Sequence, residues 1–273
     1  MVVDSLPISV IVVARNAEQT LEACLESIRK NNPAEIIVVD GNSTDRTVAI
    51  AREYTGKVFS DEGKGIGDAR QIGAEQATQE YIAYVDSDVT LGDNALATML
   101  FEFRDSKYIS LHARVSEDMK CANYWERAQL QHYLIPRADA IGMLTSIFRR
   151  ETILKYKFDL SSEHLDDVSL EYKLKKAGFK FGTSSVRVYH YWKTDFKHLF
   201  AHRYLLGRYL PRAMRKYGPW WYPGYYPPLV TLYWLGYAVV KGRLNLIPYF
   251  LVDGVAKTAG WIRGIFDDTR RRV

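Results

Sequence analysis

Two aspartates separated by one small residue follow an apolar stretch of this sequence. The stretch YIAYVDSDVTL runs from Tyr81 to Leu91 and begins as a buried strand would. An aspartate just after a strand is often only a turn former. Two carboxylates at this spacing can, however, hold a hard divalent cation, Mg²⁺ or Mn²⁺, which can then bridge the diphosphate of a nucleotide. We therefore predict that Asp86 and Asp88 are metal ligands.

A second pair of carboxylates, Asp166 and Asp167, lies in the segment HLDDVSLEYKLKKAGFK. The apolar residues Val168, Leu170 and Leu174 predict that the chain enters a helix here. Acidic residues in a first turn complement the positive end of the helix dipole. From the residues alone, we favour the interpretation that Asp166 and Asp167 stabilise the N-terminus of this helix.

The elements that would position these aspartates alternate between two periodicities. The run ISVIVVA, from Ile8 to Ala14, is typical of a parallel strand covered on both faces, and TLEACLESIRK after it has apolar residues at helical spacing. The same order recurs in EIIVVD with STDRTVAIAREY, and in ARQIGAEQATQ with YIAYVD. This alternation predicts an α/β fold with a parallel, doubly wound sheet.

Polar residues follow three of the predicted strands. Arg15 and Asn16 follow the first strand, Asp40 closes the second, and Asp86 closes a later one. Ligands of such sheets bind beyond the carboxyl ends of the strands. These residues are therefore the first candidates for a binding site.

The segment after Asp40 supplies its own capping residues. Ser43 or Thr44 can cap the helix in STDRTVAIAREY. A role as turn former or cap is also the favoured interpretation of Asp45.

Four segments in order resemble glycosyltransferase family 2, the inverting nucleotide-sugar enzymes with a GT-A fold. They are SVIVVARNAEQTLEACLESI, EIIVVDGNSTDRT, GDARQIGAEQATQEYIAYVDSDV and HLDDVSLEYKLKKAGFK. A DxD alone occurs by chance in many chains, but four segments in this order and spacing are specific. The resemblance runs from about Ile8 to about His190 and implies a Rossmann-like, mostly parallel sheet flanked by helices.

The resemblance also implies which residues bind the donor. Asp40 would contact the nucleobase, and the motif from Asp86 to Asp88 would bind the metal and the diphosphate. Arg70 and Gly73 match the ARNxG element that lies beside the donor in the family. Many members have DDGS where this chain has a single aspartate followed by Gly41 and Asn42. The expected donor-binding residues are Ala14, Arg15, Asn16, Asp40, Arg70, Asp86 and Ser87.

By the same resemblance, Asp166 and Asp167 are catalytic. The family has an acidic pair here, usually Glu-Asp, whose aspartate deprotonates the acceptor hydroxyl as it attacks the anomeric carbon. Asp167 matches the base, and Asp166 stands in place of the glutamate. A single in-line displacement would then invert the anomeric centre.

A histidine and a glycine-rich segment lie close to these motifs in the sequence. His190, in VRVYHYW, is either a structural residue or a ligand of the metal or diphosphate, which makes Asp86, Asp88 and His190 the candidate metal set. The glycines of GKGIGD lack clean GxGxxG spacing directly after a strand, so a dinucleotide fingerprint is not favoured. We interpret GKGIGD as a mobile loop over the donor.

The composition changes after His190. The segment DFKHLFAHRYLLGRYLPRAMRKYG combines apolar residues at helical spacing with many basic ones. The basic residues in this segment and just before it include Lys193, Lys197, Arg203, Arg208, Arg212, Arg215 and Lys216. The pattern predicts an amphipathic helix on anionic lipid, with a basic helix packed against the core as the alternative.

Aromatic residues and short apolar runs make up the rest of the chain. An aromatic cluster comprises Trp220, Trp221, Tyr222, Tyr225 and Tyr226. The apolar runs after it are interrupted by Lys241, Arg243, Asp253 and Lys257. Each run is too short for a bilayer core of about 30 Å, so we predict helices that lie on the membrane surface.

Length and composition indicate the domain organisation and the charge of a binding partner. The 273 residues are 47% apolar, which allows a full core, and the net charge of +5 suits an anionic partner. We expect a GT-A catalytic domain at 1–195, with a nucleotide-sugar half at about 1–100 and an acceptor half at about 101–195, and a helical membrane-associating region at 196–273.

Cysteines and the N-terminus indicate the compartment. Cys24 and Cys121 form no disulfide framework or zinc motif, which indicates a reducing cytosol. MVVDSLP has neither a basic region nor a cleavage site, so no secretory signal is expected. We predict a peripheral or monotopic protein on the cytoplasmic side of the cell membrane, with no nucleic-acid partner.

Three hypotheses about function follow. The favoured one is inverting transfer of a sugar from a nucleoside-diphosphate sugar to a hydroxyl of a lipid-linked, glycan or other membrane-associated acceptor, with Mn²⁺ or Mg²⁺ as cofactor. A sugar nucleotidyltransferase would carry a Gly-rich basic loop after the first strand, which VARNAEQTLEACL lacks. A noncatalytic membrane-binding module is the third, and Asp86, Asp88 and Asp167 argue against it.

Overall fold

The computed structural model describes residues 5–135, 141–159, 166–191, 195–218, 224 and 226–270. Contacts group the chain into two units, Met1–Met119 with Pro136–Tyr191 and Lys120–Ile135 with Trp192–Val273. Lys120–Ile135 thus groups with the C-terminal helices, although it lies within the predicted acceptor half. The predicted division at residue 195 remains a prediction. Of the residues in the predicted basic helix and aromatic cluster, Lys193, Trp220, Trp221, Tyr222 and Tyr225 lie outside the described residues.

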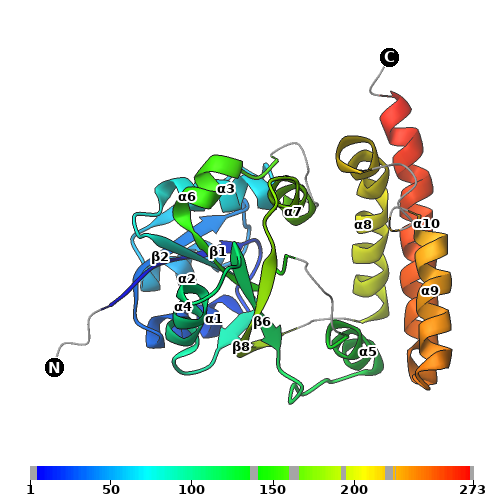
Figure 1. Cartoon of the computed structure of the whole chain (residues 1–273), viewed down its shortest axis with the longest axis horizontal. Coiled ribbons are helices and arrows are strands. Elements are labelled where there is room, and N and C mark those ends of the chain that lie inside the picture. The colour runs from blue at the N-terminus through cyan, green and yellow to red at the C-terminus, as the bar shows by residue number, and fades with distance from the viewer. Residues whose placement is uncertain are drawn as a thin grey trace. The chain divides into compact units, whose positions relative to one another are not determined.

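The first unit is built on one sheet with the strand order β3-β2-β1-β4-β7-β6-β8-β5 (Figure 1). The strands are β1 (Leu6–Ala14), β2 (Pro33–Asp40), β3 (Val58–Ser60), β4 (Tyr81–Asp86), β5 (Val89–Leu91), β6 (Ser110–Val115), β7 (Thr145–Arg149) and β8 (Phe181–His190). The first three strands and β4 pair in parallel, as predicted. β7 runs antiparallel to both β4 and β6, so the second half of the sheet is mixed.

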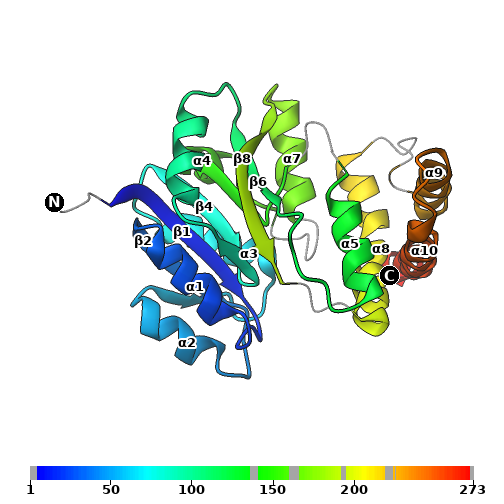
Figure 2. The ribbon, with the colours of Figure 1, turned by 90° about the horizontal axis from the view of Figure 1, so that it is seen from below.

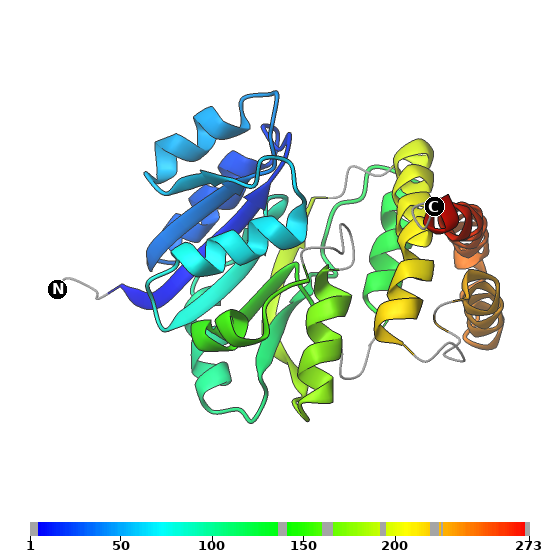
Figure 3. The ribbon, with the colours of Figure 1, turned by 90° about the horizontal axis from the view of Figure 1, so that it is seen from above.

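Helices cover both faces of this sheet. They are α1 (Leu21–Lys30), α2 (Thr47–Tyr54), α3 (Ile66–Gln76), α4 (Ala95–Arg104), α6 (Arg150–Tyr156) and α7 (Asp166–Lys176). Val10 and Val12 of β1 pack with α1, α2 and α4 on one face (Figure 2), and Ile11 packs with α3, α6 and α7 on the other (Figure 3). The continuous apolar run of the first strand is explained by this double burial, and the predicted α/β class is confirmed.

Two local predictions about these helices are wrong. α3 begins at Ile66, so the second half of GKGIGD is the first turn of a helix and not a loop. α2 begins at Thr47, and neither Ser43 nor Thr44 caps it. Asp45 instead accepts hydrogen bonds from the backbone N and the Oγ1 of Thr47, at 3.0 and 2.5 Å. The interpretation of Asp45 as a turn former is confirmed.

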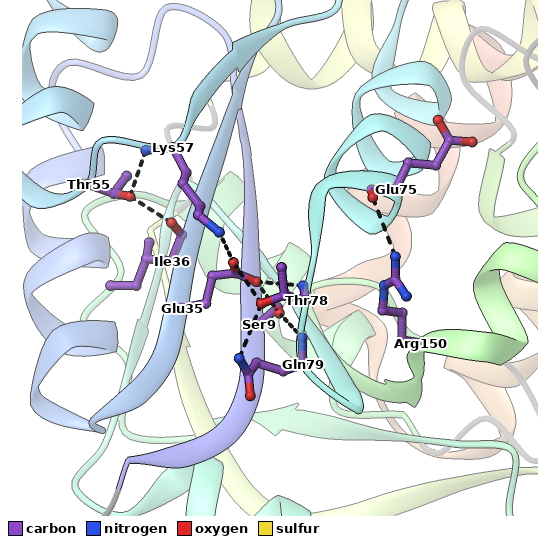
Figure 4. Close-up of polar contacts among 9 residues, drawn as sticks. All are labelled: Ser9, Glu35, Ile36, Thr55, Lys57, Glu75, Thr78, Gln79 and Arg150. Carbon is purple, nitrogen blue, oxygen red and sulfur yellow. Dashed lines mark hydrogen bonds and ion pairs between the residues drawn. The ribbon is translucent and has the colours of Figure 1, made fainter.

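Glu35 organises a polar cluster at the amino ends of β1, β2 and β4 (Figure 4). Its buried carboxylate accepts hydrogen bonds from Ser9, Lys57 and Thr78. Ser9 Oγ also accepts a hydrogen bond from the Gln79 backbone at 3.1 Å. Burial raises the pKa of Glu35, but the hydrogen bonds from Lys57, Ser9 and Thr78 outweigh it and hold the pKa below 4.5. The cluster lies at the end of the strands opposite to the one where ligands of such sheets bind.

The second unit is helical. Its elements are α5 (Tyr124–Tyr133), α8 (Phe196–Tyr217), α9 (Pro227–Val240), the 3₁₀ turn η2 (Leu244–Leu246) and α10 (Ile247–Arg270). α8 and α10 lie against each other along their length (Figure 1). Glycine permits this approach, because a Cβ on Gly260 would lie 1.9 Å from the Tyr204 carbonyl oxygen and one on Gly207 would lie 2.1 Å from the Lys257 carbonyl oxygen.

A buried ion pair lies between α8 and α10. Arg203 Nε lies 3.0 Å from Asp253 Oδ1, and its Nη2 donates to the Tyr249 hydroxyl at 2.9 Å. Lys257 Nζ lies 2.8 Å from the other oxygen of Asp253. Arg203 is only 7% exposed, so its predicted place in a lipid-facing basic set is wrong. An uncompensated charge in this core would be costly, and pairing with Asp253 removes that cost.

Among the helices in the described part of the chain, none is both long enough and apolar enough to cross a bilayer.

Candidate active site

The predicted binding residues meet at one edge of the sheet. In the strand register, Ala14 pairs with Asp40, and Val13 pairs with Asp86. The carboxyl ends of β1, β2 and β4 are therefore neighbours, as the alternation of strands and helices predicted.

Arg70 connects the two pairs of aspartates. It lies on α3, is 4% exposed, and donates from Nη2 to Asp86 Oδ1 at 3.0 Å and from Nη1 to Asp166 Oδ2 at 2.5 Å. Arg70 and Asp166 are 96 positions apart in the chain. One buried guanidinium thus joins the end of β4 to the start of α7, and this shared contact is not evident from the sequence.

Asp86, which is bonded to Arg70, and Asp167, which follows Asp166, both have raised pKa values. Burial raises the pKa of Asp86 to about 6, with Arg70 opposing the rise and Asp88 adding to it. Burial and the charge of Asp166 raise the pKa of Asp167 to about 6, again against Arg70. A carboxylate with a pKa near 6 is ionised at neutral pH and is a stronger base than an ordinary aspartate. Such shifts are typical of catalytic groups.

Asp166 and Asp167 differ in their contacts. Asp166 is 3% exposed and bound to Arg70, whereas Asp167 is partly exposed and accepts a hydrogen bond from the Val168 backbone at 2.7 Å. A Cβ on Gly67 would lie 3.0 Å from the Cβ of Asp166, so α3 and α7 approach closely here. These contacts fit Asp166 as the anchor and leave Asp167 as the member of the pair that can reach a substrate.

His190 lies beside the DxD motif. Its Nε2 is 3.1 Å from Asp88 Oδ2, because β5 and β8 pair with Val89 opposite His190. The Tyr191 backbone also donates to the Asp88 carbonyl oxygen at 2.8 Å. The structure therefore brings His190 and Asp88 together, as the candidate metal set requires.

The donor atoms at this edge come from carboxylates and one imidazole. The described residues contain no group of three or more His, Cys, Asp or Glu side chains that could hold a metal by themselves. Mg²⁺ is commonly held by one or two carboxylates with substrate phosphates and water, and Mn²⁺ accepts carboxylate oxygen and imidazole nitrogen. The Asp88 carboxylate and the His190 imidazole fit a cation that takes its remaining ligands from a diphosphate.

Asp40 offers an acceptor at the end of β2. The residue is 6% exposed, and its Oδ2 accepts a hydrogen bond from the Ser43 backbone at 3.0 Å. Its Oδ1 is buried and has no hydrogen-bond partner within the described residues. A buried acceptor without a donor is unfavourable, so an N–H group of a ligand would satisfy it. This observation fits the predicted contact with a nucleobase.

The other predicted donor residues lie around Asp40. Asn16 has a left-handed backbone with φ of 50°, and its Oδ1 accepts from the Thr44 backbone at 2.9 Å. The Ala14 carbonyl oxygen accepts from Gly41 N at 2.8 Å, and Arg15 is exposed. Asn16 thus orders the loop after β2, which the sequence did not indicate, and donor contacts from Ala14, Arg15 and Asn16 remain predictions.

Ser87 and Gly73 complete the predicted set. Ser87 is half-buried between the two aspartates of the DxD motif. A Cβ on Gly73 would lie 2.4 Å from Ile11 Cγ2, so this glycine lets α3 pack closely on β1. Gly73 therefore has a packing role that places Arg70.

Sequence reasoning missed Asp61. This aspartate is 2% exposed, and its carboxylate accepts hydrogen bonds from Gly63 N at 2.7 Å and Gly65 N at 3.0 Å. It holds the two glycines, both with positive φ, in the turn that leads into α3. The signal was an aspartate two and four positions before glycines, a pattern typical of side-chain-stabilised turns.

A comparison with protein families identifies the family. The sequence profile described as glycosyl transferase family 2 matches residues 9–161. The chain belongs to glycosyl transferase family 2. The matched stretch contains Asp40, Arg70 and the DxD motif and ends before Asp166, so the assignment of a base in this family member depends on the contacts described above.

Curated relatives match parts of this family 2 chain. It is 31% identical over 105 residues to the lipopolysaccharide core biosynthesis glycosyltransferase LpsC of Rhizobium meliloti, which is 37% of this chain and 38% of that protein. It is 33% identical over 113 residues to the 4,4'-diaponeurosporenoate glycosyltransferase of Staphylococcus haemolyticus, 38% of this chain and 30% of that protein. The matches thus span less than half the length of these relatives.

Solved structures share the fold. The mannosyltransferase PcManGT from Pyrobaculum calidifontis, in complex with GDP-Man and Mn²⁺, has a TM-score of 0.66 at 16% identity, with 97% of this chain and 88% of that chain covered. The glucosyl-3-phosphoglycerate synthase of M. tuberculosis has a TM-score of 0.58 at 18% identity, with 78% and 81% covered. At these identities the likeness shows the GT-A fold alone.

Proposed function

We propose that this protein transfers a sugar from a nucleoside-diphosphate sugar to a hydroxyl of an amphiphilic acceptor, with inversion at the anomeric carbon. The observation that carries the proposal is the double ion pair of Arg70 with Asp86 and Asp166. It joins the motif expected to bind the diphosphate to the pair expected to supply the base. A donor held beyond β4 would therefore have its reacting carbon near α7.

The chain's own residues have distinct tasks in this reaction. Asp167 accepts the proton of the acceptor hydroxyl, whose oxygen attacks the anomeric carbon while the bond to the diphosphate oxygen breaks. Asp40 receives the nucleobase, and Arg70 keeps Asp166 and Asp86 in place. A divalent cation bound by Asp88 and His190, with Asp86 beside it, would neutralise the charge of the leaving diphosphate.

The relatives and the helical unit support the acceptor class that we propose. The matched relatives are named for lipopolysaccharide core biosynthesis and for glycosylation of 4,4'-diaponeurosporenoate. α9 and α10 expose many large apolar side chains, including Leu232 and Phe266. We infer a lipid-linked or otherwise membrane-associated acceptor, reached from the cytoplasmic face of the membrane.

A donor panel tests the proposal. UDP-, GDP- and dTDP-sugars are added with and without Mn²⁺, and the melting temperature is recorded, because a ligand of the native state stabilises it by mass action. We expect one nucleotide to raise the melting temperature only when the cation is present, and the matching sugar to be transferred to an amphiphilic alcohol. Activity with a nucleoside triphosphate and a sugar phosphate would instead identify a nucleotidyltransferase. No shift with any nucleotide would indicate a noncatalytic module.

A further inference from the structure

One side of α9 is apolar and exposed. Leu229, Leu232, Tyr233, Val239 and Val240 have between 51% and 80% of their surface exposed. Their spacings of three, four and seven positions place them on the same side of a helix with 3.6 residues per turn. Contiguous exposed apolar surface of this kind marks a contact with a protein or a membrane.

The opposite side of α9 is fixed against α10. Ala238 is fully buried, and the ring of Trp234 stacks on Phe250 with centroids 5.4 Å apart and an interplanar angle of 18°. A Cβ on Gly254 would lie 2.1 Å from Thr231 Oγ1, so the two helices approach closely. The packing of α9 within its own unit therefore determines which of its sides is exposed.

α10 carries a second exposed stripe. Leu251, Val255, Ile262 and Phe266 are 45% to 60% exposed and follow one another at four, seven and four positions. α10 packs against α8 through Lys257 and Gly260, and against α9 through Phe250 and Gly254. The stripe uses neither of these two sides of the helix.

The chemistry around α9 favours an anionic bilayer over a protein. α9 contains no charged residue, and exposed Lys241 and Arg243 follow it directly, beside Leu244, which is 58% exposed. Apolar insertion next to basic residues is the pattern of helices that lie in the interface of acidic membranes. The 14 residues of α9 extend about 21 Å, less than the roughly 30 Å of a bilayer core, so the helix would lie along the surface.

We propose that the exposed side of α9 inserts into the interface of an anionic bilayer, with Lys241 and Arg243 at the lipid headgroups. This inference rests on the proposed function, because it names the surface by which the enzyme would reach an amphiphilic acceptor. The sequence-based prediction placed both the basic segment that forms α8 and the later apolar runs on the membrane, whereas the exposed side chains single out one side of α9.

Flotation of the full chain with vesicles tests the surface. The vesicles are phosphatidylcholine alone or phosphatidylcholine mixed with phosphatidylglycerol. We expect the wild-type chain to float with the mixed vesicles, and the double variant Leu232→Glu with Val240→Glu to lose about tenfold or more in vesicle affinity. The matched control is Phe101→Glu on α4, because Phe101 is 75% exposed in the other unit and should bind as wild type does.

Two outcomes overturn the inference. One is equal loss of vesicle binding in the α9 variant and the Phe101 control. The other is wild-type protein that stays unbound, and a dimer in light scattering that only the α9 variant dissociates would then assign this surface to a second copy of the chain. Circular dichroism should show unchanged folding of both variants, because the replaced side chains are exposed. Binding of nucleoside diphosphate with Mn²⁺ is measured separately, without vesicles. Loss of this binding would contradict the proposed function, whereas loss of vesicle binding alone would contradict only the inference about α9.

Discussion

Two carboxylate clusters lie at opposite ends of the same parallel strands, and they differ in how their charge is matched. At the amino ends, Glu35 is bound by Lys57, Ser9 and Thr78, and its pKa is lowered. At the carboxyl ends, Asp86 and Asp166 share Arg70. Asp88 and Asp167 add further negative charge beside them. The first cluster is matched by hydrogen bonds within the fold, whereas the second places four carboxylates around one arginine, which fits the cation and substrate proposed for it.

Replacement of Arg70 should have the largest effect. Arg70→Met leaves two buried or half-buried carboxylates without their shared cation, which should lower the free energy of unfolding by about 3–5 kcal/mol and abolish transfer. The measurement is chemical denaturation. Arg149→Met is the control, because the Arg149–Glu80 pair is exposed and should contribute about 0–1 kcal/mol. Equal stabilities of the two variants would contradict the account of the Arg70 cluster.

Asp167→Asn should separate turnover from stability. We expect kcat to fall roughly 10²-fold or more, because the general base is lost, while donor affinity and melting temperature change little. Steady-state kinetics with the donor found in the panel measure both parameters. Asp166→Asn is the comparison, since it should disturb Arg70 and lower stability. A larger kinetic loss in Asp166→Asn with intact folding would reverse the assignment of the base.

Glu35→Gln should show the opposite behaviour. The substitution removes the charged acceptor of a buried cluster, so the free energy of unfolding should fall by about 1–3 kcal/mol while kcat is unchanged. Because the folded pKa of Glu35 lies below 4.5, its contribution is present above that pH and is lost as the pH falls through the folded pKa. Glu80→Gln, at an exposed pair, should be near neutral. Denaturation curves at neutral and acid pH test both statements.

The pH dependence of turnover should show the smallest effect. The pKa of Asp167 is raised to about 6, so kcat/KM should increase as the pH rises through about 6, where the base becomes ionised. The acid limb should disappear in Asp167→Asn, leaving low and flat activity. A limb that persists in this variant would assign the titration to another group.

The sequence predicted the parts of the candidate active site that depend on local pattern. The apolar runs and the polar residues after them located the strand ends, and the resemblance placed Asp86, Asp88 and Asp167. The pairing of β5 with β8, which brings His190 to Asp88, is a long-range contact with no local signal. The same is true of the shared partner Arg70, whose two bonds connect three separate elements.

Burial was the other property that the sequence did not provide. Glu35 is the polar residue at the start of EIIVVD. Nothing in that run indicates that Lys57 and Thr78 would hydrogen-bond to it. Arg203 shares its helical spacing with exposed basic residues, yet it faces Asp253 inside the helical unit. The spacing of side chains along a helix indicates which residues share a face, but which element packs against that face depends on the tertiary structure.

Calorimetric binding of nucleoside diphosphate tests the central claim most directly. The claim is that the carboxyl ends of the strands, and not the amino ends, bind a cation-linked diphosphate. We predict that wild type and Glu35→Gln bind the nucleotide with Mn²⁺ and that chelation removes this binding. Asp88→Asn should lose the cation-dependent binding while remaining folded. Nucleotide binding that is unchanged in Asp88→Asn, or that is lost in folded Glu35→Gln, would contradict the account.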